Sequence, residues 1–240
     1  MLDLEKLVYL DMQKTGSTRT IDFLNKSSTL QLQHFSPHQV LPQNYNRPAA
    51  LFFTTVRNPF DLYVSSFRFG CDGPDSIRLW MEAHGVTGLY EPTNEAFNAW
   101  IEFISDPKNA AAIGEGFEIV SKFGVGIMSY RHLIYSIRHP NQPMFNIGSL
   151  ADFDEVYEHE NVMQLVIRNE ELDEELQKLA QERLPEYFDQ ELVDIYFARR
   201  REINVTKTGK AEDFQFSPAM KELVREREQF LLRRYYPELA

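Results

Sequence analysis

The sequence predicts a three-layer α/β fold in which helices flank a central, mostly parallel sheet. Two short apolar runs, Leu7–Leu10 and Leu51–Val56, have the length and β-prone composition of strands buried on both faces. Each run is followed by a segment with the spacing of an amphipathic helix. Strands that alternate with helices in this way favour a parallel sheet, and ligands bind such sheets beyond the carboxyl ends of the strands.

The expected elements follow one another along the chain. A helix is expected after the first strand, and residues 29–34 alternate apolar and polar side chains at the period of a further strand. The second apolar run ends at Asn58 and Pro59, which can cap and open another helix. Spacing and flanking residues then predict helices at 97–104, 120–128, 172–179 and 218–236, and a strand at 162–167. Because no repeat or long linker interrupts this order, we expect a single domain over residues 1–240.

Composition narrows the class of protein. Of the 240 residues 43% are hydrophobic and 25% charged, which is the balance of a globular chain. Acidic residues outnumber basic ones by 36 to 25, and the net charge of −11 argues against a nucleic-acid partner. The one cysteine, Cys71, excludes an intrachain disulfide. Neither a transmembrane run nor a secretory signal is visible, so we expect a soluble, cytoplasmic protein.

The loop after the first strand is a candidate anion site. It places Lys14, Gly16, Ser17 and Thr18 between a buried strand and the start of a helix. Backbone N–H groups, the positive end of the helix dipole and the lysine could cradle a phosphate there. The loop differs from the Walker A pattern, in which lysine follows a second glycine. The alternative is an ordinary strand–helix turn with a solvated lysine.

A second candidate follows the second strand. Arg57 stands at the end of that strand, and Ser65 lies two turns into the next helix. A guanidinium fork and a hydroxyl can hold a phosphate together through charge-assisted hydrogen bonds. The alternative is a capped helix whose arginine pairs with a surface carboxylate.

Together, residues 13–18 and 57–65 resemble the sulfotransferases that use 3′-phosphoadenosine 5′-phosphosulfate (PAPS), and are most similar to the carbohydrate-type and bacterial branch. Residues 166–172 and 204–206 match the family more loosely. The sequence departs from the family at Gln13, where proline is usual, and residues 206–210 are at best a stand-in for the R-K-G loop of the cytosolic class. The third contact to the 3′-phosphate is therefore left open.

The resemblance implies a P-loop NTPase-like fold and transfer of the sulfuryl group from PAPS to an acceptor hydroxyl on a carbohydrate, lipid or small molecule. Lys14 would stabilise the leaving oxygen as adenosine 3′,5′-bisphosphate (PAP) forms, and no metal would be required. Arg57 and Ser65 would bind the 3′-phosphate. The residues assigned to the nucleotide are Lys14, Thr15, Gly16, Ser17, Thr18, Arg57 and Ser65.

The acceptor hydroxyl needs a general base, for which histidine is the common choice. We predict His34, because it would end the strand at 29–34 on the ligand edge and because some carbohydrate sulfotransferases have a histidine in a similar place. His38 is the second choice, and a carboxylate is the third. Two other functions stay open: a nucleotide-dependent kinase that needs magnesium, and a non-catalytic protein that binds the nucleotide. The sequence names neither the acceptor nor the oligomeric state.

Overall fold

The computed structural model describes residues 1–73, 75–138, 146–199 and 214–240. The chain forms two compact units, between which it passes several times. The sheet unit comprises Met1–Arg57, Tyr135–His139 and Asn161–Val205, and the helical unit comprises Asn58–Ile134, Pro140–Glu160 and Thr206–Ala240. The family matches predicted at 204–206 and 206–210 lie outside the described residues. The prediction that residues 1–240 are a single domain stays a prediction.

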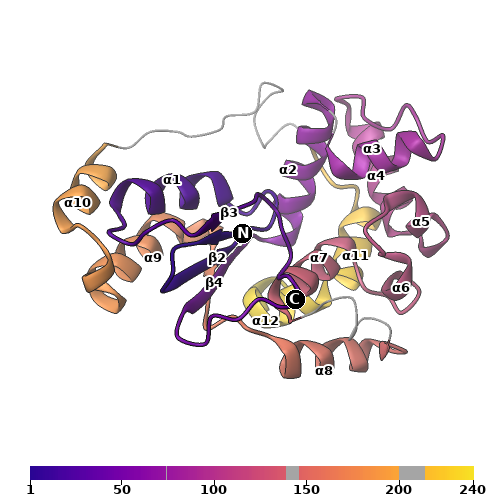
Figure 1. Cartoon of the computed structure of the whole chain (residues 1–240). Helices are drawn as coiled ribbons and strands as arrows, with labels where there is room; N and C mark the ends of the chain where they lie inside the picture. Colours follow the sequence, from indigo (N-terminus) through magenta and orange to yellow (C-terminus); the bar gives the residue numbers. More distant parts are fainter. Residues whose placement is uncertain (74, 139–145, 200–213) are drawn as a thin grey trace. The chain divides into compact units, whose positions relative to one another are not determined.

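The sheet unit contains a five-stranded sheet with the order β3-β1-β2-β4-β5 (Figure 1). Its strands are β1 (Leu2–Asp3), β2 (Leu7–Leu10), β3 (His34–Phe35), β4 (Leu51–Val56) and β5 (Leu165–Arg168). β2, β4 and β5 run parallel, whereas β1 is antiparallel to both β2 and β3. The expectation of a mixed α/β chain with a mostly parallel sheet flanked by helices is confirmed.

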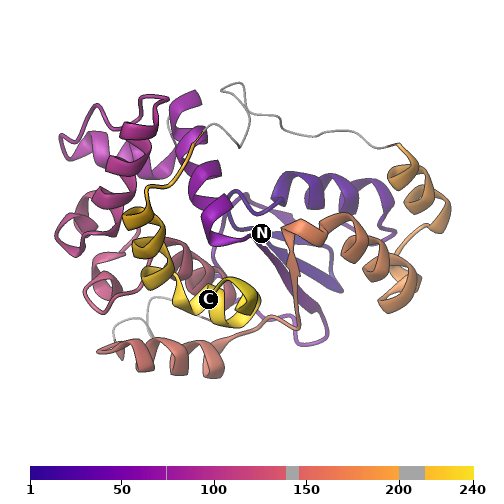
Figure 2. The same cartoon turned by 180° about the vertical axis from the view of Figure 1, so that it is seen from behind.

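Both faces of the two central strands are buried. On one face, Tyr9 of β2 and Phe53 of β4 pack in a core with α1 (Ser17–Ser27), α9 (Leu172–Lys178) and α10 (Gln190–Ala198). Figure 2 shows these three helices beside the strands from behind. The alternate residues Val8 and Phe52 face a second core that includes Leu41 and Val162. This burial on both sides explains why the two strands read as continuous apolar runs.

The prediction of a strand at 29–34 is wrong, although β2 and β4 match their predicted bounds. Only His34 and Phe35 pair, opposite Asp3 and Leu2 of β1, and Leu32 is 57% exposed. β1 is two residues long because the chain turns back at once, with the Leu4 N–H bonded to the Leu7 carbonyl. Before His34 the Gln33 N–H still donates to the Asp3 carbonyl at 2.8 Å, but residues 29–32 pair with no strand among the described residues. The strand predicted at 162–167 begins later, at Leu165.

The helical unit is built around aromatic side chains. Phe67 of α2 (Pro59–Asp72) packs on Trp100 of α4 (Asn94–Ser105) at 5.5 Å between ring centroids and on Phe214 at 5.0 Å. α3 (Ser76–Ala83), α5 (Ala110–Ile113), α6 (Glu118–Ser121), α8 (Leu150–Glu160), α11 (Pro218–Arg227) and α12 (Gln229–Tyr235) complete this unit (Figures 1 and 2). α7 (Ile127–Ser136) starts in this unit and ends in the sheet unit.

The two helices predicted at 120–128 and 218–236 are each split into two shorter helices in the structure. The helix predicted at 120–128 is broken between α6 and α7, where Gly124 has a left-handed backbone (φ +87°). A Cβ atom on Gly126 would lie 2.1 Å from Oε1 of Glu228. Glu228 itself separates α11 from α12, and its carboxylate accepts hydrogen bonds from the first turn of α7. None of the helices in the described ranges is both long enough and apolar enough to cross a bilayer.

Candidate functional site

The candidate site lies at the carboxyl ends of three neighbouring strands in the sheet unit. Leu10, the last residue of β2, pairs with Thr54 of β4, and Val56 pairs with Arg168, the last residue of β5. Parallel strands end at the same edge of a sheet, so the loop at 11–16 and Arg57 both leave the sheet at this edge.

The buried side chain of Thr15 fixes the loop at 11–16 to the sheet. Its side chain is fully buried, and its Oγ1 donates a hydrogen bond to the Met12 carbonyl at 2.9 Å. The same oxygen lies 2.8 Å from Oγ1 of Thr55, which in turn lies 2.7 Å from the Tyr9 hydroxyl. Burial raises the pKa of Tyr9, so its hydroxyl remains neutral and can donate. Since the Thr15 hydroxyl is used inside the protein, only its backbone N–H remains for a ligand.

The turn of this loop depends on two residues with left-handed backbones. Lys14 has φ +65°, and Gly16 has φ +96°. A Cβ on Gly16 would lie 2.4 Å from Oδ1 of Asn169 and 2.8 Å from Cδ2 of Leu172, so only glycine fits there. Gly16 is the N-cap of α1 and has no side chain with which to cap that helix. The first-turn N–H groups of α1 and its dipole therefore offer an anion site beside Lys14.

Arg57 follows β4 directly. The alternative prediction was an ion pair with a surface carboxylate, and Arg57 makes no such pair with any described residue. The side chain is half-buried, and its buried Nε has no hydrogen-bond partner in that part of the chain. Asn58 acts as the expected cap of α2, since its Oδ1 accepts from the Phe60 N–H at 3.0 Å. Ser65, the other residue assigned to the 3′-phosphate, is half-buried on α2 in the helical unit.

Arg168 is a cation at this edge that the sequence reasoning missed. It ends β5, in register with Val56, and its side chain is 31% exposed. Its contact with a carboxylate on the following turn, from Nε to Oε1 of Glu171, is 4.0 Å long. The signal was available, because an arginine at the end of a predicted parallel strand points to the ligand edge.

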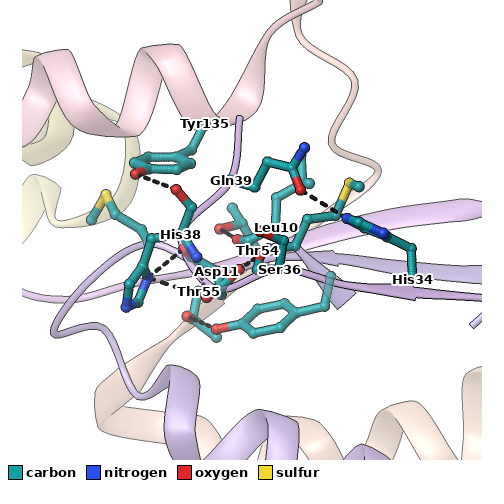
Figure 3. Close-up of polar contacts among 12 residues, drawn as sticks. Leu10, Asp11, His34, Ser36, His38, Gln39, Thr54, Thr55 and Tyr135 are labelled. Carbon is teal, nitrogen blue, oxygen red and sulfur yellow. Dashed lines mark hydrogen bonds and ion pairs between the residues drawn. The ribbon is translucent and has the colours of Figure 1, made fainter. Parts of the chain in front are cut away.

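His38 and Asp11 form a pair at the same edge, drawn in Figure 3. Asp11 follows β2, and its side chain is buried. The Nδ1 atom of His38 lies 3.1 Å from Oδ2 of Asp11 and 3.1 Å from its backbone carbonyl. Both neighbours are acceptors, so Nδ1 carries the proton and Nε2 is the basic nitrogen. The His38 side chain is 35% exposed.

The backbone of His38 is held as firmly as its ring. His38 has φ +52°, a conformation that is unusual for residues other than glycine. Its N–H donates to Oδ2 of Asp11 at 2.9 Å, and its carbonyl accepts from the Tyr135 hydroxyl at 2.9 Å (Figure 3). A backbone strained in this way persists only where its surroundings over-determine it, and such residues concentrate at functional sites.

The charge of Asp11 is stabilised in spite of its burial. Burial alone would raise the pKa of this carboxyl, but hydrogen bonds from His38 and from the Met1 amino group outweigh it and hold the pKa below the usual range. Asp11 is therefore an anion at neutral pH. A buried anion beside Nδ1 holds the ring in the Nδ1–H tautomer and fixes its orientation.

His34 is placed differently. It pairs with Asp3 of β1, whose other neighbour is Val8, the second residue of the four in β2. The side chain is exposed, and its Nε2 lies 2.8 Å from Oε1 of Gln39. Figure 3 shows His34 and His38 on opposite sides of the strand ends. The strand on which the prediction of His34 rested does not lead to this residue but begins at it.

This edge of the sheet thus combines groups that can bind an anion with a histidine, His38, whose ring is oriented by Asp11 and can accept a proton. Within the described ranges, no three His, Cys, Asp or Glu side chains gather in a way that could hold a metal ion. Comparison of the chain with protein-family models, with curated proteins and with solved structures finds no match.

Proposed function

We propose that this chain is a sulfotransferase that moves the sulfuryl group of PAPS to an acceptor hydroxyl. One observation carries the proposal: the neighbouring parallel strands β2 and β4 end in two separate features suited to anions. These are the start of α1, whose N-cap is Gly16, beside Lys14, and the buried Nε of Arg57, which has no hydrogen-bond partner among the described residues. A nucleotide with phosphate groups at two positions, the 5′ and the 3′, matches two such features better than a single phosphate does.

The roles follow from where charge develops during transfer. Sulfuryl transfer resembles phosphoryl transfer, in which catalysis is mainly positioning and electrostatic stabilisation. The first-turn N–H groups of α1 would hold the 5′-phosphate, and Lys14 would donate to the oxygen that leaves sulfur. Arg57 would bind the 3′-phosphate, which the resemblance also assigns to Ser65. The fold would be the P-loop NTPase-like version of the α/β class.

The geometry favours His38 over His34 as the general base. Asp11 fixes its Nδ1–H tautomer, and Nε2 has no hydrogen-bond partner among the described residues. In His34 the Nε2 atom is already bonded to Gln39. In the proposed step, Nε2 of His38 takes the proton from the acceptor hydroxyl as the new O–S bond forms and the bond from sulfur to the phosphate oxygen breaks.

Binding of PAP without added metal tests the proposal. At 100 times Kd the ligand would stabilise the fold by about 2.7 kcal/mol, which a thermal-shift assay can detect. Transfer of radiolabelled sulfate from PAPS to acceptors in cell extracts would then report turnover. Equal stabilisation by ATP with magnesium would favour the kinase, and binding of PAP without turnover on any acceptor would favour the non-catalytic protein.

Variants of the two anion features sharpen this test. Lys14→Ala is expected to lower turnover more than PAP affinity, because its contact strengthens as the leaving group gains charge. Arg57→Ala is expected to weaken PAP more than adenosine 5′-phosphosulfate, which lacks the 3′-phosphate. Lys26→Ala is the matched control, since Lys26 is exposed on α1 and pairs with Asp22 at 2.7 Å. Equal losses of both ligands in Arg57→Ala would contradict its assignment.

A further inference from the structure

Three buried hydroxyls in the sheet unit form a hydrogen-bonded chain that ends on the loop at 11–16. Tyr9 of β2, Thr55 of β4 and Thr15 of the loop are each fully buried. The Tyr9 hydroxyl lies 2.7 Å from Oγ1 of Thr55, and that oxygen lies 2.8 Å from Oγ1 of Thr15. The Thr15 hydroxyl donates to the Met12 carbonyl at 2.9 Å. The chain therefore connects the interior of the sheet unit to the backbone of the loop.

The hydrogen bonds of this chain can point in only one direction. A carbonyl only accepts and a hydroxyl has a single proton to donate, so the proton of Thr15 is used on Met12. Thr55 is then the donor to Thr15, and Tyr9 is the donor to Thr55. Burial raises the pKa of Tyr9, so its hydroxyl keeps the proton that this order requires. Tyr9 is the first donor of the chain, in which each bond strengthens the next.

The carbonyl at the end of the chain belongs to the turn that carries Lys14. The bond from the Thr15 side chain to the Met12 carbonyl spans Gln13 and Lys14. Lys14 has a left-handed backbone (φ +65°), which is costly for a residue with a Cβ atom. Such a conformation persists only where its surroundings impose it, and the bond across this turn is one such constraint. The direction in which the lysine leaves the loop thus depends on hydroxyls inside the sheet unit.

The ring and the hydroxyl of Tyr9 have separate roles. The ring packs on Phe53 of β4 at 4.8 Å between ring centroids, in the core that α1 covers. A phenylalanine at this position would keep that packing, so the hydroxyl contributes through its hydrogen bonds alone. Because Tyr9 is fully buried, its hydroxyl cannot touch a ligand. Any effect of this hydroxyl on turnover has to pass through the residues to which it is bonded.

We propose that Tyr9 is a positioning residue for Lys14 and acts through Thr55 and Thr15. The inference rests on the proposed function, in which Lys14 donates to the oxygen that leaves sulfur. That contact strengthens as the oxygen gains charge, so a small displacement of the lysine raises the barrier more than it weakens nucleotide binding. The first-turn N–H groups of α1, which hold the nucleotide in the same proposal, are fixed by the helix itself.

The test is Tyr9→Phe, assayed by transfer of radiolabelled sulfate at saturating PAPS to the acceptors of a cell extract. The transfer rate is expected to fall about 10- to 100-fold, the effect of displacing a reacting group by about 1 Å. The Kd for PAP should stay within about twofold, and the unfolding temperature should fall by about 2–5 °C, as for one lost hydrogen bond. Tyr45→Phe is the matched control, because the Tyr45 hydroxyl donates to Oδ2 of Asp3 at 2.8 Å and not to the loop. Its transfer rate should stay within about twofold of the wild-type rate.

Two further comparisons separate positioning from a general weakening of the fold. In a Lys14→Ala background, Tyr9→Phe should change the transfer rate by no more than about twofold, because no lysine is left to position. Thr55→Ser keeps the hydroxyl and should keep most of the rate. Thr55→Val removes the hydroxyl but keeps the shape of the side chain, and it should reproduce the loss seen in Tyr9→Phe.

The outcomes distinguish the inference from the proposed function. If Tyr9→Phe and Tyr45→Phe lower the transfer rate equally, or if Tyr9→Phe costs as much without Lys14 as with it, the Tyr9 hydroxyl is structural. The inference is then overturned while the proposed function stands. Where Lys14→Ala is too slow to assay, the two Thr55 variants decide, and equal losses in both overturn the inference. If wild-type protein neither binds PAP nor transfers sulfate from PAPS, the proposed function fails and the inference fails with it.

Discussion

Two fully buried carboxylates, Asp11 in the sheet unit and Glu228 in the helical unit, are satisfied in contrasting ways. Glu228 accepts four hydrogen bonds from interior groups: the Tyr63 hydroxyl, the Met128 N–H, and the N–H and hydroxyl of Ser129. Asp11 accepts from the Met1 amino group and from the N–H of His38, and it also contacts the partly exposed His38 ring. The first network is closed, and the second opens to solvent.

The pKa values of the two carboxyl groups are shifted in opposite directions. Burial raises the pKa of Glu228 above its usual value, and the surrounding donors only partly offset this effect. For Asp11, burial is outweighed by hydrogen bonds that include those of His38, and the pKa is lowered. A closed network fixes the ends of helices, whereas a network that ends in an accessible titratable ring can also move a proton. This difference separates a structural carboxylate from a candidate functional one.

The largest expected effect is on turnover. His38→Ala is expected to lower kcat by about 10²- to 10⁴-fold, the contribution of a positioned general base, while PAP binding survives. His34→Ala is the control and should leave kcat within a few-fold. The assay is sulfuryl transfer from PAPS under saturating acceptor. If the two variants exchange these results, His34 is the base as the sequence predicted, and if neither matters, a carboxylate is.

The next largest effect is on stability in the helical unit. Glu228→Ala leaves buried donors of Tyr63 and Ser129 without an acceptor and is expected to lower the free energy of unfolding by about 3–5 kcal/mol. Glu226→Ala, at an exposed position on α11, should change it by about 0.5 kcal/mol or less. Urea titration followed by circular dichroism measures both. A loss below about 1 kcal/mol in Glu228→Ala would show that the network is not closed.

The sequence could predict those parts of the fold and site that depend on neighbours in the chain. β2 and β4 are continuous apolar runs because both their faces are buried, and the turn at Gly16 follows one of them directly. The anion loop and Arg57 could therefore be assigned to one sheet edge from the local pattern of residues alone. The cap of α2 by Asn58 was predictable for the same reason.

The parts that failed depend on contacts between distant residues. His34 was assigned to the end of a strand because its neighbours alternate, but the two-residue length of β1 decides where pairing begins. The contact between His38 and Asp11 joins residues 27 apart, and that between Ser129 and Glu228 joins residues 99 apart. Nothing in the local pattern marks either carboxylate as buried.

The third prediction concerns pH. Asp11 has a lowered pKa in the folded state, so its stabilising contribution is present above the usual Asp range and is lost as the pH falls through the folded value. Asp11→Asn removes this contribution, with an expected cost of about 1.5–3 kcal/mol at neutral pH. The difference in unfolding free energy between the wild type and the variant should shrink as the pH is lowered from about 6 to about 2. A difference that is constant with pH would show that the charge of Asp11 is not what stabilises the fold.

The smallest expected effect comes from a variant that tests whether turnover depends on the left-handed backbone conformation of His38. Tyr135→Phe removes only the hydroxyl that donates to the His38 carbonyl and should cost about 0.5–1.5 kcal/mol of stability. If the strained conformation of His38 serves proton transfer, kcat should fall several-fold while KM for PAPS stays unchanged. Tyr45→Phe is the control, since its hydroxyl donates to Asp3 at 2.8 Å in the same unit, away from His38. Equal changes of kcat in both variants would mean that Tyr135 acts through general stability rather than through His38.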